Sequence, residues 1–228
     1  TKINSEGKII FSKTLIELFY ENNLEFYLHG EGFNIKEPFH LNDIEPVKND
    51  GYSWKVNDIF ISIRNLSMII LYRPGENRII DIIQGPFFNQ HDVDILNAEQ
   101  ISIFNNKSKV IFNKNQNIYD KRIKKNNNIL IYDFKKDSVI NKYETLFEKY
   151  DIRTPTQGLA EVMKDGSFFV EESDYGRLLK FDSDGKLALE YINRGSNGKL
   201  YPLKWFRVVN NIDNSFVEKI DRNHCDGR

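Results

Sequence analysis

The chain has one cysteine, two methionines, two tryptophans and four histidines in 228 residues. The single cysteine, Cys225, excludes an internal disulfide and a metal–thiolate cluster, but it does not decide the cellular compartment. No two histidines have the i, i+2 or i, i+4 spacing of a local zinc site. We therefore expect no disulfide, no metal ion and no cofactor.

The chain also lacks an excess of either charge, with 32 basic against 33 acidic residues. A formal net charge of −1 provides no global field that would attract nucleic acid or an anionic membrane. No apolar run approaches the roughly 20 residues that are needed to span a bilayer. With 40% hydrophobic and 13% aromatic residues, the sequence predicts a folded protein without nucleic-acid partners, in which local groups must hold any bound anion.

Short apolar runs separated by turn signals recur in a four-part pattern. Each copy opens with an acidic residue among apolar ones, at Glu45, Asp94 and Glu161. These residues lie 49 (94 − 45) and 67 (161 − 94) positions apart. The first interval matches a β-propeller blade of about 40 to 50 residues. The pattern predicts an all-β fold, a β-propeller with four-stranded antiparallel blades.

The expected strands follow from the three copies. They lie at 43–47, 58–63, 68–72 and 76–81, then at 92–96, 100–104, 129–134 and 136–140, and finally at 159–163, 165–170, 177–181 and 184–189. The longer second interval implies an insertion, and the polar stretch 113–128 is expected to be an exposed loop. Short connecting helices are expected at 14–22 and 143–150.

The chain is expected to be a single propeller domain, residues 1–228. Ser5–Ser12 resembles the last strand of an earlier blade. Three copies are too few for a closed ring, because propellers typically have four to eight blades. We therefore expect a fragment of a larger propeller that lacks the N-terminal blades.

Three polar residues stand at the ends of strand-like apolar runs. They are His40, Arg64 and His91. Imidazole and guanidinium groups are poor core material and good partners for an oxyanion. If the repeats surround one axis, these side chains could converge on a sulfate or phosphate group.

The motifs around these residues resemble the arylsulfotransferase family of six-bladed propellers. The motifs are His40-Leu41-Asn42-Asp43, Ser62-Ile63-Arg64-Asn65, Gln90-His91-Asp92 with Ile101–Asn106, and Gly166–Glu172 with Tyr175–Leu179. The resemblance implies transfer of a sulfuryl group from a phenolic sulfate ester to a phenol, without a nucleotide donor and through a sulfohistidine. It also implies a periplasmic or secreted location and small-molecule partners; the oligomeric state stays open.

The resemblance also implies roles for individual residues. His91 would be the nucleophile, and His40 and Arg64 would hold the sulfuryl oxygens. The neighbouring polar residues Asn42, Asn65 and Asp92 would orient these side chains. A further sulfate-binding histidine of the family belongs to an earlier blade, and His29 does not stand in a matching motif, so activity of this stretch alone stays open.

Each of these residues also has a structural interpretation. His91 could bond a neighbouring blade, Arg64 could form an ion pair with an acidic residue, and His40 could end a turn. The whole chain could then be a noncatalytic propeller scaffold, or a hydrolase of an anionic ester at the same axial pocket.

The remaining conspicuous residues favour structural interpretations. Trp54, Trp205 and the many Phe and Tyr are expected in the blade core rather than as a platform for a phenol, although one or two of them could line the mouth of the central channel. His29 and His224 are expected at the surface. Asp182–Gly185 is expected to be a hairpin turn, because it lacks the later ligands of a calcium loop.

Overall fold

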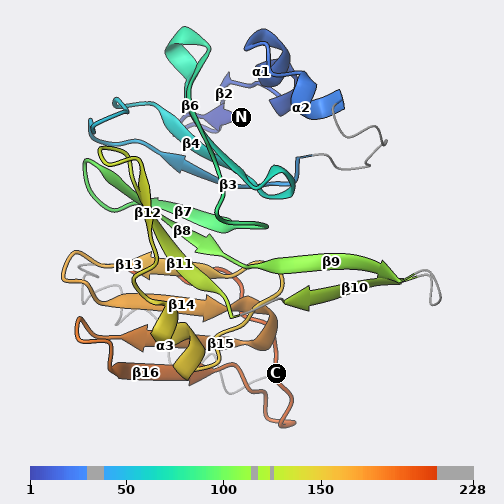
Figure 1. Cartoon of the computed structure of the whole chain (residues 1–228), viewed down its shortest axis with the longest axis vertical. Helices are drawn as coiled ribbons and strands as arrows, with labels where there is room; N and C mark the ends of the chain where they lie inside the picture. Colours follow the sequence, from blue (N-terminus) through green and yellow to red (C-terminus); the bar gives the residue numbers. More distant parts are fainter. Residues whose placement is uncertain (30–38, 114–117, 124–125, 210–228) are drawn as a thin grey trace.

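The computed structural model describes residues 1–29, 39–113, 118–123 and 126–209 (Figure 1). His224 and Cys225 lie outside these residues.

Three four-stranded antiparallel sheets form the body of the molecule and lie one above another (Figure 1). The first contains β3 (Leu41–Pro46), β4 (Ile59–Ile63), β5 (Met68–Arg73) and β6 (Arg78–Gln84). The second contains β7 (His91–Ile95), β8 (Gln100–Asn105), β11 (Asn128–Asp133) and β12 (Ser138–Ile140). The third contains β13 (Leu159–Val162), β14 (Phe168–Glu172), β15 (Arg177–Phe181) and β16 (Leu187–Ile192). The prediction of four-stranded propeller blades is confirmed, and a ring of six blades stays a prediction.

The acidic residue of each sequence repeat occupies the same place in the strand pairing of its blade. Each acidic residue lies on the first strand of its blade and pairs with a residue of the second strand. The pairs are Glu45–Phe60, Asp94–Ser102 and Glu161–Phe169. The first strands β3, β7 and β13 are neighbours in space. The three carboxylates therefore form an acidic row, Glu45, Asp94 and Glu161, along the inner strands.

Apolar side chains fill the spaces between the blades. On β8 and β11, Ile103 and Leu130 face the first blade, whereas Phe104 and Ile129 face the third. This alternation follows from the two-residue period of a strand. Trp54 is 2% exposed in the first interface, where it was expected to be core.

Two predicted helices are present. Thr14 caps α1 (Leu15–Glu21) in a capping box with Glu17, and α1 packs Leu18 and Phe19 on the outer face of the first blade. The second, α3 (Glu144–Lys149), joins the second blade to the third. The short helix α2 (Phe26–His29) was not predicted. In the part of the chain that the structure describes, no helix is long and apolar enough to span a bilayer.

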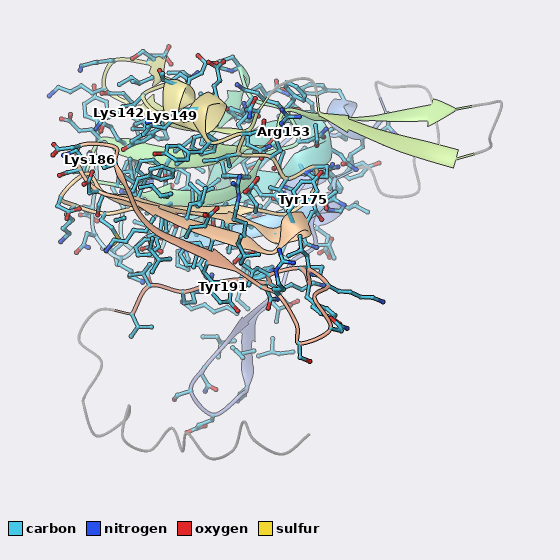
Figure 2. The ribbon with its side chains drawn as sticks, turned by 90° about the horizontal axis from the view of Figure 1, so that it is seen from below. Lys142, Lys149, Arg153, Tyr175, Lys186 and Tyr191 are labelled. Atoms are coloured by element: carbon cyan, nitrogen blue, oxygen red, sulfur yellow. The ribbon has the colours of Figure 1, made fainter. Side chains whose placement is uncertain are left out.

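The expectation of an exposed loop at 113–128 is wrong. The stretch 113–128 is not simply a loop, because β9 (Ser108–Asn113) and β10 (Ile118–Ile123) pair as an antiparallel hairpin that projects from the blades (Figure 2). The polar residues of this stretch are typical of a loop, but the two strands satisfy each other's backbone N–H and C=O groups. Ser5–Ser12 contains β2 (Ile9–Phe11), which pairs with β1 (Lys2–Ile3) as a separate hairpin around Gly7, and its place in an earlier blade stays a prediction.

Aspartates join the inner strands of adjacent blades. The Val93 backbone N–H of the second blade donates to Asp43 Oδ2 of the first over 2.8 Å. The Ala160 N–H of the third blade donates to Asp92 Oδ2 of the second over 2.7 Å. These equivalent bonds set the spacing of the strands at the end of the axis where the candidate site lies.

Candidate active site

A pocket of about 310 Å³ lies where the inner strands β3, β7 and β13 begin. Residues preceding or opening these strands line it, together with a later segment of the chain. The lining residues are His40, Leu41, Asn42, Asp43, His91, Asp92, Gln157, Gly158, Leu159, Ser173, Trp205 and Arg207. The pocket therefore draws on all three blades.

Three residues at this end of the blades occupy equivalent positions. Arg64, Asn106 and Ser173 each directly follow the second strand of their blade, β4, β8 and β14. In the first and third blades this position begins a one-turn 3-10 helix, η1 (Arg64–Leu66) or η3 (Ser173–Tyr175). In the second blade the chain continues towards the β9–β10 hairpin instead. The repeat thus presents a guanidinium, an amide and a hydroxyl group at one end of the axis.

The His91 ring is held by Asn106. His91 Nδ1 lies 2.7 Å from Asn106 Oδ1. The Asn106 amide nitrogen donates to the carbonyl oxygens of Thr154 and Gln157, so its oxygen must be the atom that accepts from His91. The proton of the neutral ring is therefore on Nδ1, and Nε2 carries the lone pair.

His91 is neutral over most of the pH range. Burial is the main cause that lowers the pKa of His91, to about 4. The hydrogen bond to Asn106 opposes this effect, and the positive charges of Arg64 and His40 add to it. A neutral imidazole is the form that can act as a nucleophile.

His40 lines the same pocket as His91, whereas Arg64 is not among its lining residues, although its charge contributes to lowering the pKa of His91. The Arg64 backbone N–H donates to the His40 carbonyl oxygen over 3.1 Å. The Arg64 guanidinium donates from Nη1 to Asn65 Oδ1, also over 3.1 Å. Asn65 thus contacts the arginine, whereas the side chain that holds the His91 ring is Asn106.

Asn42 and Asp92 line the pocket and hold backbone groups rather than rings. Asn42 Nδ2 donates to the Gln90 carbonyl oxygen over 2.6 Å, and Asn42 Oδ1 is buried without a hydrogen-bond partner among the described residues. Asp92 accepts from the Ala160 N–H of the third blade. Burial, reinforced by the charge of Asp94, raises the pKa of Asp92.

Strained backbone is concentrated at the pocket. Four lining residues other than glycine have positive φ angles: His40 at 49°, Asp92 at 50°, Gln157 at 59° and Trp205 at 66°. For a bulky residue such as Trp205 this conformation is a genuine outlier. Strain of this kind persists where the surroundings over-determine it, and it is concentrated at functional sites.

Sequence reasoning missed Asn106, which is buried and holds the His91 ring, and several residues that line the pocket. Asn106 had a detectable signal, because it follows its strand as Arg64 does. Gln157 and Ser173 belong to turns without a chemical motif. The expectation that Trp205 is blade core is wrong: its side chain is 58% exposed and lines the pocket together with Arg207. Both follow the last repeat, so the repeat pattern carried no signal for them.

The acidic row continues away from the pocket along the inner strands. Burial and the charges of Asp43 and Glu161 raise the pKa of Glu45 to about 7. Burial and the charges of Glu161 and Glu45 raise the pKa of Asp94 to about 7. The charge of Arg207 opposes the shift at Asp94. Adjacent carboxylates thus disfavour one another's ionisation.

The other conspicuous polar residues lie away from this pocket. His29 Nε2 is 2.8 Å from the Tyr20 hydroxyl group. Asp182–Gly185 is a turn, in which the Gly185 N–H donates to the Asp182 carbonyl oxygen over 3.0 Å. Within the described ranges, no group of three or more His, Cys, Asp and Glu side chains is arranged to hold a metal ion.

A family model described as arylsulfotransferase (ASST) matches residues 1–194 of this chain. The matched stretch contains all three blades with His40, Arg64 and His91, and it ends before Trp205 and Arg207. No curated protein matches the chain significantly.

Solved structures show weaker similarity. One is a functionally unknown protein from Desulfotomaculum acetoxidans DSM 771, with a TM-score of 0.41 and 14% identity over 72% of this chain and 44% of that one. Another is U3-55K, with a TM-score of 0.37 and 8% identity over 70% of this chain and 53% of that one. A third is virginiamycin B lyase from Staphylococcus aureus, with a TM-score of 0.32 and 10% identity over 70% of this chain and 66% of that one. The chain spans about half or less of the first two proteins.

Proposed function

This chain belongs to the arylsulfotransferase (ASST) family, and we propose that it transfers a sulfuryl group from a phenolic sulfate ester to a phenol through a sulfohistidine at His91. The observation that carries the proposal is the neutral His91 ring. Asn106 holds its Nδ1 proton, and the charges of Arg64 and His40 lie close enough to lower its pKa.

In the first half-reaction, the lone pair of His91 Nε2 attacks the sulfur of the donor. An S–N bond forms and the S–O bond to the aryl group breaks, so the electron pair leaves with the phenolate. Asn106 Oδ1 accepts the Nδ1 proton throughout, which stabilises the positive charge that develops on the ring. By holding Nδ1, Asn106 also keeps the His91 ring oriented so that Nε2 is the nitrogen that attacks.

Arg64 and His40 act on the oxygens around the sulfur. The Arg64 guanidinium is always charged, and its planar fork can donate to two sulfuryl oxygens. Asn65 Oδ1 accepts from Nη1 and fixes that fork. His40 can donate a proton to the departing phenolate oxygen.

In the second half-reaction, a phenol replaces the first product. His40, which gave up its proton, accepts the proton of the phenol hydroxyl group. The phenol oxygen attacks the sulfur, an S–O bond forms and the S–N bond breaks. The neutral ring of His91 returns to its starting state, so no cofactor is consumed.

A donor-only pulse tests the proposal. The chain is mixed with 4-nitrophenyl sulfate without acceptor, and its intact mass and peptide map are measured. We expect one nitrophenol per chain and a sulfuryl group, SO₃, on His91. Addition of phenol should then restore continuous nitrophenol release and remove the adduct. A folded chain that releases no nitrophenol and gains no mass would contradict the proposal and favour the scaffold alternative.

The hydrolase alternative predicts a different result. Continuous nitrophenol release without phenol, at a rate that phenol does not change, would mean that water is the acceptor.

A further inference from the structure

The segment after the last strand contributes Trp205 and Arg207 to the lining of the pocket and is held by hydrogen bonds to the third blade. The Leu203 N–H donates to the Ser173 carbonyl oxygen over 3.0 Å, and the Tyr201 N–H donates to Asn193 over 2.9 Å. The Phe206 ring lies 5.8 Å from the ring of Phe169 on β14. The segment is therefore docked on the third blade as far as Phe206.

One buried carboxylate holds the strained part of this segment. Glu171 is fully buried, and its Oε1 and Oε2 accept the backbone N–H groups of Trp205 and Phe206 over 3.2 and 2.8 Å. Ser173 Oγ donates to the same carboxylate over 2.6 Å. Glu171 thus supplies the extra contacts that keep Trp205 at its φ of 66°.

The strained conformation presents an aromatic surface to the pocket. The Trp205 indole is 58% exposed and lines the same pocket as His40 and His91. An exposed tryptophan on a strained backbone contributes little to a blade core. It does offer a flat face of the kind on which an aryl ring stacks.

Arg207 joins this aromatic surface to the electrostatics of the site. Its Cζ atom lies 5.6 Å from the centroid of the Trp205 ring, within cation–π range. Its charge opposes the burial that raises the pKa values of Asp43 and Asp94, and Arg207 lines the same pocket as Asp43. Without Arg207, those carboxylates would repel an anion in the pocket.

We propose that Trp205 and Arg207 form the aryl-sulfate side of the pocket: Trp205 stacks on the aromatic ring of the ester, and Arg207 offsets the negative charge of Asp43 and Asp94. The ligand class is an aromatic sulfate ester, and the proposal rests on the proposed function for the chemistry that follows binding. The family model ends before both residues, so the family match does not include this side of the pocket.

Binding measurements separate this proposal from turnover. Calorimetric titrations of the whole chain with phenyl sulfate and with inorganic sulfate give two dissociation constants for each variant. Trp205→Ala should weaken phenyl sulfate about tenfold, since aromatic contact and buried area are both lost, and should change inorganic sulfate less than about twofold. Trp205→Phe should retain most of the phenyl sulfate affinity.

Arg207→Gln should weaken both ligands, because a charge effect does not depend on the aryl ring. Tyr52→Ala is the matched control: Tyr52 is 61% exposed and does not line this pocket, so neither ligand should change. Equal weakening of both ligands by Trp205→Ala, or weakening of neither, would overturn the inference, as would a native chain that does not bind phenyl sulfate. Binding as expected without a His91 adduct would instead overturn the proposed sulfuryl transfer alone.

Discussion

His91 Nδ1 donates to Asn106 Oδ1 over 2.7 Å, and this bond selects the ring nitrogen that can react. Both residues stand at the same end of the second blade, one opening β7 and the other following β8. One pair of adjacent strands therefore positions both the proposed nucleophile, His91, and the side chain that orients it, Asn106.

The pH dependence of the donor step should change when Asn106 changes. In the native chain, the step needs neutral His91, so its rate should fall as the pH falls through about 4. Asn106→Asp places a carboxylate beside the ring, which raises the pKa of His91 and should move this limb upwards by about 1 pH unit or more. Asn106→Ala should lower the rate by about 10- to 100-fold and move the limb no higher. Nitrophenol bursts from pH 3.5 to 8 measure both effects.

Replacement of His91 separates its catalytic and structural interpretations. His91→Asn should abolish the sulfuryl adduct and lower the transfer rate by at least about 10³-fold. The free energy of unfolding should fall by only about 1 to 3 kcal/mol, the cost of one altered buried hydrogen bond. Urea denaturation and the donor pulse are made on the same sample. A variant that still acquires the adduct would refute His91 as the nucleophile.

The acidic row predicts that the fold is most stable at mildly acidic pH. Folding raises the pKa values of Glu45 and Asp94 from their usual values of about 4 to about 7, so between about pH 4 and 7 the native chain binds more protons than the unfolded chain. Stability should therefore be highest near pH 4 to 5 in respect of these groups, and fall as the pH rises to about 7. Urea midpoints of the native chain and Glu45→Gln from pH 5 to 8 test this. The variant should be the more stable of the two at pH 8, with a flatter profile. A native profile that rises throughout this range would contradict the assignment.

Two replacements of Asp92, which joins the second blade to the third, should change the free energy of unfolding by different amounts. Asp92→Ala leaves the Ala160 N–H without its acceptor and should cost about 1 to 3 kcal/mol of unfolding free energy. Asp92→Asn keeps an acceptor oxygen and removes a carboxylate from a crowded acidic region, so it should cost little or add stability. Thermal and urea unfolding measure the difference. Similar losses in the two variants would mean that Asp92 has a role beyond this bond.

The β9–β10 hairpin should be dispensable for the fold. Its strands pair with each other and belong to no blade. Lys109 and Arg122 face each other in the hairpin, so a two-residue Asn-Gly turn can replace residues 110–121 and close the strands. The unfolding free energy should change by less than about 1 kcal/mol, because the strand pairing within the three blades stays intact. The donor pulse at His91 is the second measurement. Loss of the adduct in a stable variant would assign a substrate contact to the hairpin.

The repeat was readable from the sequence because propeller blades use strands with a two-residue period and turns with distinctive residues. Asp165-Gly166 and Asp184-Gly185 mark hairpins, and the acidic residue of each copy fixes the register. The blades and connecting helices therefore appeared where the pattern put them. The β9–β10 pair did not, since Asn- and Lys-rich residues match a loop as well as an exposed hairpin.

The sequence by itself determined the blade architecture and marked His40, Arg64 and His91 as residues out of place in apolar strands. Only the tertiary structure decided which nitrogen of His91 faces outwards, because Asn106 reaches it across two strands. Tertiary structure also decided that Trp205 belongs to the pocket. Its position depends on Glu171, 34 residues earlier, and no local pattern encodes a contact between segments that distant in the chain.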